Sequence, residues 1–170
     1  MTSPFRWEVR GDKDIVLGFG TLPERMVNRL EVVIRRHIEA IKNAAQAKVS
    51  GGVLKLRTGA LRDALGRGTS VSRSDTRIVG KVGLAGADAK TAIAGGAQEY
   101  GATIAAHIVR AVNTSKLRFT IDGKFFFAKQ VLIQETKIPE HSFLRSSLRE
   151  QAPLFARDVV TVVGTLGVEG

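Results

Sequence analysis

The amino-acid sequence predicts an α+β fold, and three observations lead to that class. Apolar residues recur at helical spacing over residues 22–48, and again after Ser142. Apolar and polar residues alternate before the first helix, as in half-buried strands. Asp122-Gly123 joins two β-rich runs and indicates a hairpin. We therefore expect a long N-terminal amphipathic helix packed on a mostly antiparallel sheet, with a protruding β-hairpin and a C-terminal helix, in a single domain over residues 1–170.

The N-terminal elements are a hairpin and the long helix. Apolar and charged residues alternate from Phe5, and a Gly-Asp turn returns the chain, which predicts a hairpin over residues 5–19. Thr21 and Glu24 have the spacing of a capping box, so the helix is expected over residues 22–48.

The middle of the chain predicts a short helix and the sheet. Thr58 can cap a helix over residues 59–65. Residues 69–138 are expected to hold the sheet and the hairpin, with a Gly/Ala-rich loop that contains a weak helical turn at 85–96 and a strand at 131–138.

The hairpin around Asp122-Gly123 is rich in phenylalanine. A type I′ turn there pairs Ile121 with Lys124 and sets the register of the ribbon. An isolated two-stranded ribbon is marginal in water, so it needs a cover. The ribbon could be covered by loops of the same chain or by another subunit, and the sequence favours neither. The apolar residues lie on both faces, with Leu117, Phe119 and Phe126 on one and Phe125 and Phe127 on the other.

The C-terminal region predicts a helix that follows a proline-terminated strand. Pro139 ends the strand, because its ring removes a backbone donor. Ser142 can cap a helix over residues 142–163, in which Pro153 is expected to break or restart the backbone.

Composition excludes several classes of chemistry. The chain has no Cys, which removes disulfides and thiolate catalysis and fits a reducing cytoplasm. His37, His107 and His141 lack metal-binding spacing, and we see no nucleophile elbow or phosphate loop. We therefore expect neither enzymatic activity nor a cofactor. The N-terminus lacks the apolar segment of a secretory signal, and no apolar run reaches the roughly 20 residues of a membrane helix.

The charge balance favours acidic partners. Lys and Arg number 26 against 16 Asp and Glu, a formal net charge of +10. From Lys48 to Lys81 there are eight basic residues and two acidic ones. This stretch has no aromatic residues for base stacking, which argues against a single-strand binding site.

Four segments, taken in order, resemble the phage tail-completion and head–tail joining proteins of the virion morphogenesis family. They are Leu56–Asp63, Val79-Gly80, Gln98–Ile104, and the hairpin 117–128 leading to Ile138–Arg145. The last segment departs from the family pattern, because Glu-His-Ser stands where the family tends to have Ala, Arg and Pro.

The resemblance implies a small α+β protein that forms a ring, commonly a hexamer, in the neck or at the head-proximal end of the tail. Its partners would be further copies of the chain and neighbouring connector and tail-tube proteins, with DNA passing through the lumen. The protein would be made in the bacterial host cytoplasm and reside in the virion. The alternative function is a stand-alone basic DNA-binding protein, whose DNA affinity would depend strongly on salt.

Two sets of residues are therefore hypotheses for contact. Glycines can permit close backbone approaches, Tyr100 offers an amphipathic ring, and basic residues near a lumen would ease the passage of phosphates. The expected assembly interface is Thr58, Gly59, Arg62, Tyr100, Gly101, Phe125, Phe127, Pro139, Phe143 and Arg145. Ordinary core packing is the favoured alternative for Phe143. The residues expected to face the lumen or DNA are Lys55, Arg57, Arg67 and Arg73, with simple surface solvation as an equal alternative.

Overall fold

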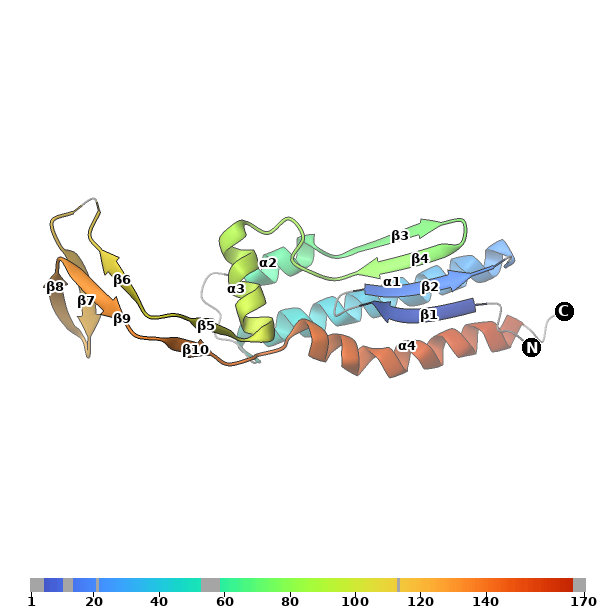
Figure 1. The fold of residues 1–170 in the computed structure, drawn as a ribbon. Coiled ribbons are helices and arrows are strands. Elements are labelled where there is room, and N and C mark those ends of the chain that lie inside the picture. The colour runs from blue at the N-terminus through green and yellow to red at the C-terminus, as the bar shows by residue number, and fades with distance from the viewer. Residues whose placement is uncertain (1–4, 11–13, 21, 53–58, 113, 167–170) are drawn as a thin grey trace.

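The computed structural model describes residues 5–10, 14–20, 22–52, 59–112 and 114–166. It is an α+β structure in which a body of helices and a four-stranded sheet carries a long arm at one end (Figure 1). The arm is the ribbon at the left of the view, and it points away from the body. The predicted fold class, including the protruding hairpin, is confirmed.

The sheet of the body is antiparallel throughout. It contains β1 (Phe5–Arg10), β2 (Asp14–Phe19), β3 (Ser70–Ser74) and β4 (Arg77–Lys81), in the order β1-β2-β4-β3. The N-terminal hairpin expected over residues 5–19 is present as β1 and β2. β2 pairs with β4, so the two hairpins join into one sheet.

The long helix α1 (Glu24–Ala47) ends in the short segment η1 (Lys48–Gly52), in which the backbone of Ser50 and Gly51 is no longer helical. It begins two residues later than predicted, with Pro23 at the N-cap and no side-chain cap. Thr21, the predicted cap, lies outside the described residues. Gly80 of β4 lets the helix approach the sheet, because a Cβ there would lie 2.4 Å from Ile38 Cγ1. The buried stripe of α1 is Val27, Leu30, Val33, Ile34, His37, Ile38, Ile41 and Ala45.

The C-terminal helix α4 (Leu144–Leu166) lies along α1 (Figure 1). The prediction that Pro153 breaks this helix is wrong, because the helix runs through it. A proline inside a helix removes one backbone hydrogen bond. Here the residues after it, Phe155 and Val159, are fully buried in the core and hold the second half of the helix in place.

The two short helices meet at the end of the body from which the arm departs. α2 (Ala60–Arg67) begins one residue later and ends two residues later than the predicted range 59–65, with Gly68 as its C-cap. Gly59 is its N-cap in the left-handed conformation, with φ +72°. Thr58 lies outside the described residues.

The loop expected at 85–96 is wrong for most of its length, because α3 (Ala89–Tyr100) is a helix of three turns. Asp88 caps it, and its carboxylate accepts a hydrogen bond from the Thr91 N–H at 3.0 Å. Alanine is the strongest helix former, and four alanines in the segment outweigh the two glycines. Gly95 faces Leu84, where a Cβ would lie 2.4 Å from Leu84 Cδ1, so it is a packing residue.

The arm is a two-stranded ribbon with one continuous register over most of its length. Ile104 lies opposite Thr136, His107 opposite Ile133, and the Ala111 N–H donates to the Lys129 oxygen. The strand predicted over 131–138 is therefore two strands, separated by Gln134-Glu135. The strands of this part are β5 (Ala102–Ile104), β6 (His107–Arg110), β9 (Gln130–Ile133) and β10 (Thr136–Ile138).

The tip of the arm is the predicted hairpin, β7 (Leu117–Ile121) and β8 (Lys124–Ala128). Its register is confirmed, with Ile121 opposite Lys124 and Phe119 opposite Phe126. Asp122 and Gly123 both have positive φ, +50° and +77°, as a type I′ turn requires.

None of the helices in the described ranges is long and apolar enough to cross a membrane.

His37 links the two long helices. Its ring is buried, and its Nε2 lies 2.9 Å from Asp158 Oδ2 on α4. A carboxylate only accepts, so Nε2 carries the proton. Nδ1 lies 3.2 Å from Gln151 Oε1, and the ring packs edge-on against Phe155. The hydrogen bond from His37 holds the pKa of Asp158 below its usual value.

We expect His37→Ala to lower the free energy of unfolding by about 1–3 kcal/mol, because it removes a buried ring together with its hydrogen bonds to Asp158 and Gln151. His107→Ala is the control, since that side chain is exposed and bonds only a local carbonyl. It should change stability by less than about 0.5 kcal/mol. Chemical denaturation of both variants measures this, and equal losses would contradict the role assigned to His37.

Candidate assembly surface

The arm carries most of the exposed apolar surface of the molecule. Of the fifteen exposed large hydrophobic side chains in the described residues, ten lie between Ala102 and Ile138. No described residue of that range is buried. The ten are Ile104, Ile108, Val109, Val112, Ile121, Phe125, Phe126, Phe127, Leu132 and Ile133.

The two faces of the tip hairpin differ in exposure. Phe119 and Phe126 stack on one face with ring centroids 6.0 Å apart, and Phe119 is half-buried. Phe125 and Phe127 lie on the other face and are 63% and 62% exposed. The Arg118 guanidinium lies 5.0 Å from the Phe125 ring centroid. The second face is therefore an aromatic surface with a cation beside it, in contact with solvent.

The apolar area of the arm is large for a monomer. A buried aromatic side chain covers about 150–250 Å², so Phe125, Phe126 and Phe127 leave on the order of 300 Å² in water. The seven aliphatic side chains at least double this. Summed over both faces of the arm, the total is on the order of 800 Å², which is near what one partner contributes to a stable interface.

Glu99 anchors the arm to the body. Its side chain is 4% exposed and lies at the end of α3, one residue before Tyr100. The carboxylate accepts hydrogen bonds from the backbone N–H groups of Phe143, Leu144 and Arg145 at 2.8–2.9 Å. These are donors that the first turn of α4 cannot satisfy within the helix. Glu99 thus caps α4 from a different helix, 44 positions away in sequence for Phe143.

Side chains on either side complete this cap. The Ser142 hydroxyl donates to Glu99 Oε1 at 2.9 Å, and its oxygen accepts from the Ser146 N–H at 3.2 Å. Arg145 donates to Glu99 Oε1 through Nε and to the Glu99 carbonyl through Nη2. The predicted capping role of Ser142 is therefore present, but Glu99 accepts most of the N–H groups.

Burial raises the pKa of the Glu99 carboxyl, but the backbone N–H donors of Arg145, Leu144 and Phe143 and the Ser142 hydroxyl outweigh it. The pKa of Glu99 is therefore below its ordinary value. The positive end of the α4 dipole acts in the same direction. The site holds a fixed negative charge at neutral pH, placed between α3 and α4.

The two strands of the arm leave the body side by side at this point. The His141 N–H donates to the Gln98 carbonyl at 2.7 Å. Gly101 has φ +72°, and a Cβ there would lie 3.1 Å from the Ile138 oxygen, so both its conformation and its space require glycine. The Arg145 guanidinium lies 4.7 Å from the Tyr100 ring centroid. These contacts hold the base of the ribbon against α3 and α4.

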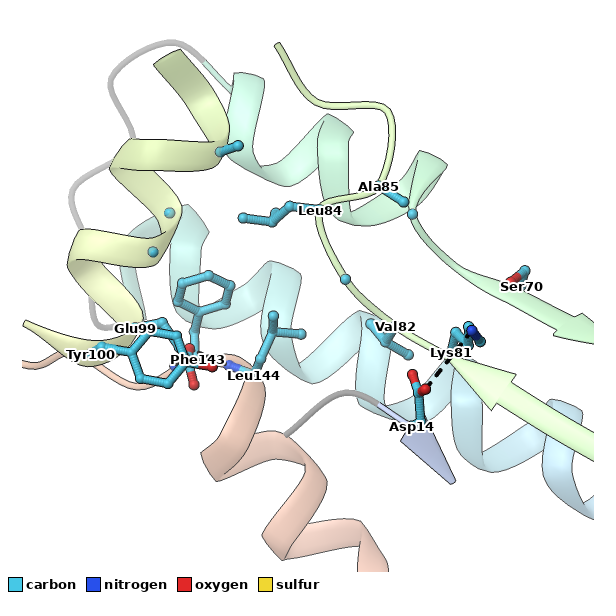
Figure 2. Close-up of a pocket in the computed structure, with 15 residues that line it drawn as sticks. Asp14, Ser70, Lys81, Val82, Leu84, Ala85, Glu99, Tyr100, Phe143 and Leu144 are labelled. Carbon is cyan, nitrogen blue, oxygen red and sulfur yellow. Dashed lines mark hydrogen bonds and ion pairs between the residues drawn. The ribbon is translucent and has the colours of Figure 1, made fainter. Parts of the chain in front are cut away.

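A groove opens beside this anchor, between α3, the segment after β4 and the start of α4 (Figure 2). Its volume is about 570 Å³. The walls are mostly apolar, and the charged pair Asp14 and Lys81 lies at one end, 3.9 Å apart. The apolar walls are Val82, Leu84, Ala85, Ala92, Phe143 and Leu144, with Gly95 and Gly96 of α3 between them.

The structure divides the predicted interface residues into separate places. Tyr100, Gly101, Pro139 and Arg145 meet at the base of the arm, whereas Phe125 and Phe127 lie at its tip. Gly59 and Arg62 belong to α2 in the body.

Phe143 does not belong to an exposed interface. Its side chain is 0% exposed, and it packs in the core with Leu144. The first turn of α4 faces inward, because the Glu99 cap fixes it against α3. This position in the predicted interface is therefore corrected to a core position.

The predicted lumen residues are only partly described. Lys55, Arg57 and Thr58 lie outside the described residues. Arg67 is exposed at the end of α2. Arg73 donates to Glu24 and Asn28 at 2.7 Å and lies 3.5 Å from Glu31, so acids of α1 already compensate its charge. This pairing weakens its assignment as a DNA contact.

The amino-acid sequence does not reveal that Glu99 caps α4, although Glu99 lies in Gln98–Ile104, one of the segments that carry the resemblance. A single acid at a helix end carries no local signal of a partner 44 positions away. The groove was missed for the same reason, because its walls come from α3, α4 and the segment after β4.

Within the described ranges, no group of three or more His, Asp or Glu side chains is placed to hold a metal ion. Comparisons with protein-family models, with curated proteins and with solved structures gave no match for this chain.

Proposed function

We propose that this chain is a structural protein of a phage virion, a ring-forming tail-completion or neck protein that joins the tail to the head-side connector. One observation carries the proposal: a projecting arm exposes ten large hydrophobic side chains that its own body leaves uncovered. Burial of apolar surface is the main drive for protein association, so such an arm favours assembly.

The anchor at the base of the arm supports the same function. An arm that binds a neighbour needs a fixed orientation relative to its own body. Here both strands are bonded to α3 and α4 through Gln98, Glu99 and Arg145. Of the segments that resemble the virion morphogenesis family, Gln98–Ile104 and Ile138–Arg145 meet at this anchor, and the hairpin 117–128 forms the tip of the arm. Repetition of one head-to-tail contact around an axis closes a ring, for which we propose six copies.

The proposed location is the neck or head-proximal tail end of the particle, after synthesis in the host cytoplasm. Further copies of the chain, connector proteins and tail-tube proteins are the proposed partners. The basic residues, Arg67 among them, would face DNA passing through the lumen.

Removal of the two exposed aromatics tests the proposal. We expect Phe125→Ser with Phe127→Ser to leave the chain folded, because neither side chain is buried, but to abolish oligomers and incorporation into particles. The control is Val32→Ser with Val160→Ser, which removes two exposed apolar side chains from the body. Native mass spectrometry of the purified chain and the protein content of purified particles measure the result. Normal incorporation of the arm variant would contradict the proposal.

The alternative function, a stand-alone basic DNA-binding protein, rests on the charge of the chain. The arm itself has six basic residues against two acidic ones. A monomer whose DNA affinity falls steeply with salt, and which forms no oligomer and enters no particle, would favour this alternative.

A further inference from the structure

We propose that the aromatic face at the arm tip, Phe125 and Phe127, docks into the groove beside α3 of a second copy of this chain. The inference rests on the proposed self-assembly and adds the surface that receives the arm. The groove is defined by the apolar walls given above, with Gly95 and Gly96 on one side and Asp14 at one end.

The groove has the size and chemistry to receive phenylalanine. Its volume of about 570 Å³ lies within the roughly 300–1,000 Å³ of pockets that bury small molecules. Leu84, Ala92 and Leu144 offer aliphatic contacts. The one buried charge on the wall, Glu99, has its carboxylate fully engaged by backbone donors, so an aromatic ring beside it displaces no needed partner.

Charge at the end of the groove matches charge beside the aromatics. Asp14 is half-buried, and the Lys81 ammonium lies 3.9 Å away, at the limit of an ion pair. Arg118 lies over the Phe125 ring on the arm. A docked arm can therefore bring Arg118 toward Asp14 while the aromatic rings enter the apolar part.

The arm cannot fill its own groove. The two strands of the arm, residues 102–111 and 129–138, run in register away from the body. At about 3.3 Å per residue, these ten residues on each strand give the ribbon a length of about 33 Å. The tip hairpin lies beyond them (Figure 1). That reach is comparable with the diameter of a small domain. It suits contact with the body of an adjacent copy.

A protein partner fits the arm better than a nucleic acid. Seven of the ten exposed apolar side chains are aliphatic and offer no stacking surface for bases. The apolar area of the arm is close to what one partner contributes to a stable interface. A second copy supplies the groove, and the groove of each copy lies next to the base of its own arm, since Tyr100 lines it. Each copy can therefore donate an arm and receive one, as a ring requires.

Cysteine cross-linking tests the contact, because the chain has no Cys of its own. We expect oxidation of the double variant Gly96→Cys with Phe127→Cys to give a ladder of covalent oligomers. Each single variant should give no species beyond a dimer. The reaction is run on the purified chain at high concentration, and on particles that contain it. A double variant that yields only what the single variants yield would overturn the proposal.

Filling the groove is a second, independent test. A Cβ on Gly96 meets nothing within 4 Å, so Gly96→Trp can occupy the groove without strain in its own chain. We expect it to weaken self-association about 10- to 100-fold, the effect of losing one buried aromatic. Gly164→Trp is the matched control, since Gly164 is also helical, exposed and free of Cβ contacts.

The outcomes separate the two proposals. Wild-type oligomers that persist in Gly96→Trp without cross-links would overturn the groove and leave the ring function standing. A wild-type chain that neither oligomerises nor enters particles would overturn both. Binding of a single-stranded oligonucleotide that is lost in the Phe125→Ser, Phe127→Ser variant, without any cross-link, would assign the arm to nucleic acid and overturn the groove.

Discussion

Replacement of Glu99 by alanine will lower the free energy of unfolding by about 3 kcal/mol or more. The variant leaves three backbone N–H groups at the start of α4 without an acceptor, and each buried unsatisfied donor costs about 1–3 kcal/mol. It also removes the 3.2 Å contact of the half-buried Arg145 with the carboxylate, while Arg145 keeps its bonds to the residue 99 carbonyl and to Glu140. Chemical denaturation measures the loss. Because Glu99 also holds the base of the arm, self-association should weaken as well.

Glu140→Ala is the matched control for this prediction. Glu140 also pairs with Arg145, at 2.7 Å, but its side chain is 54% exposed. Exposed ion pairs contribute about 0–1 kcal/mol, so the control should cost less than about 1 kcal/mol. Equal losses in the two variants would show that Glu99 acts only as a surface ion pair.

The lowered pKa of Glu99 leads to a prediction of how the free energy of unfolding depends on pH. Because the pKa of its carboxyl is lower in the folded state than in the unfolded chain, the stabilisation is complete above the unfolded value of about 4.3. It is lost as the pH falls through the folded pKa. Glu99→Gln should therefore reduce the difference in stability between pH 7 and pH 3. An unchanged pH profile in that variant would contradict the assigned charge.

Gly68→Ala is expected to destabilise the chain by about 3 kcal/mol or more, in the range of severe core overpacking. A Cβ at this position would lie 2.1 Å from the Gly83 oxygen and 2.8 Å from the Ala85 nitrogen. Both are backbone atoms, so no side-chain rotation can relieve the overlap. The segment after β4 would have to move, and it forms one wall of the groove.

Gly66→Ala, two residues earlier, is the control with the opposite sign. Gly66 lies inside α2, and its Cβ would make an ordinary contact of 3.5 Å with Gln46 Nε2. Alanine in place of glycine within a helix stabilises by up to about 1 kcal/mol. Thermal unfolding of the two variants should therefore move in opposite directions. A tolerated Gly68→Ala would contradict the close approach of α2 to the segment after β4.

The elements that could be predicted from the amino-acid sequence are those whose signals are local. Asp122-Gly123 defines the tip hairpin and its whole register, because a type I′ turn imposes both on its neighbours. The amphipathic stripe of α1 places that helix against the sheet, since its apolar period matches 3.6 residues per turn. The N-terminal hairpin follows from strand alternation.

Two breaker residues gave wrong predictions. The glycines of α3 suggested a loop, but the four alanines and the Asp88 cap, which are local signals too, favour the helix, and Gly95 packs on Leu84. Pro153 suggested a break, but the buried Phe155 after it holds α4 continuous.

The surroundings of the candidate contact residues could be read only from the tertiary structure. In the structure, Glu99 lies at the start of α4, Phe143 is buried in the core, and Arg73 pairs with acidic residues of α1. Phe125 and Phe127 are exposed on the arm, although the apolar character of these side chains alone would predict burial. Exposure depends on which chain segments lie nearby in space, and residues far apart in the sequence set that arrangement. For this reason the hairpin and its register could be predicted from the sequence, but its exposure to solvent within one chain could not.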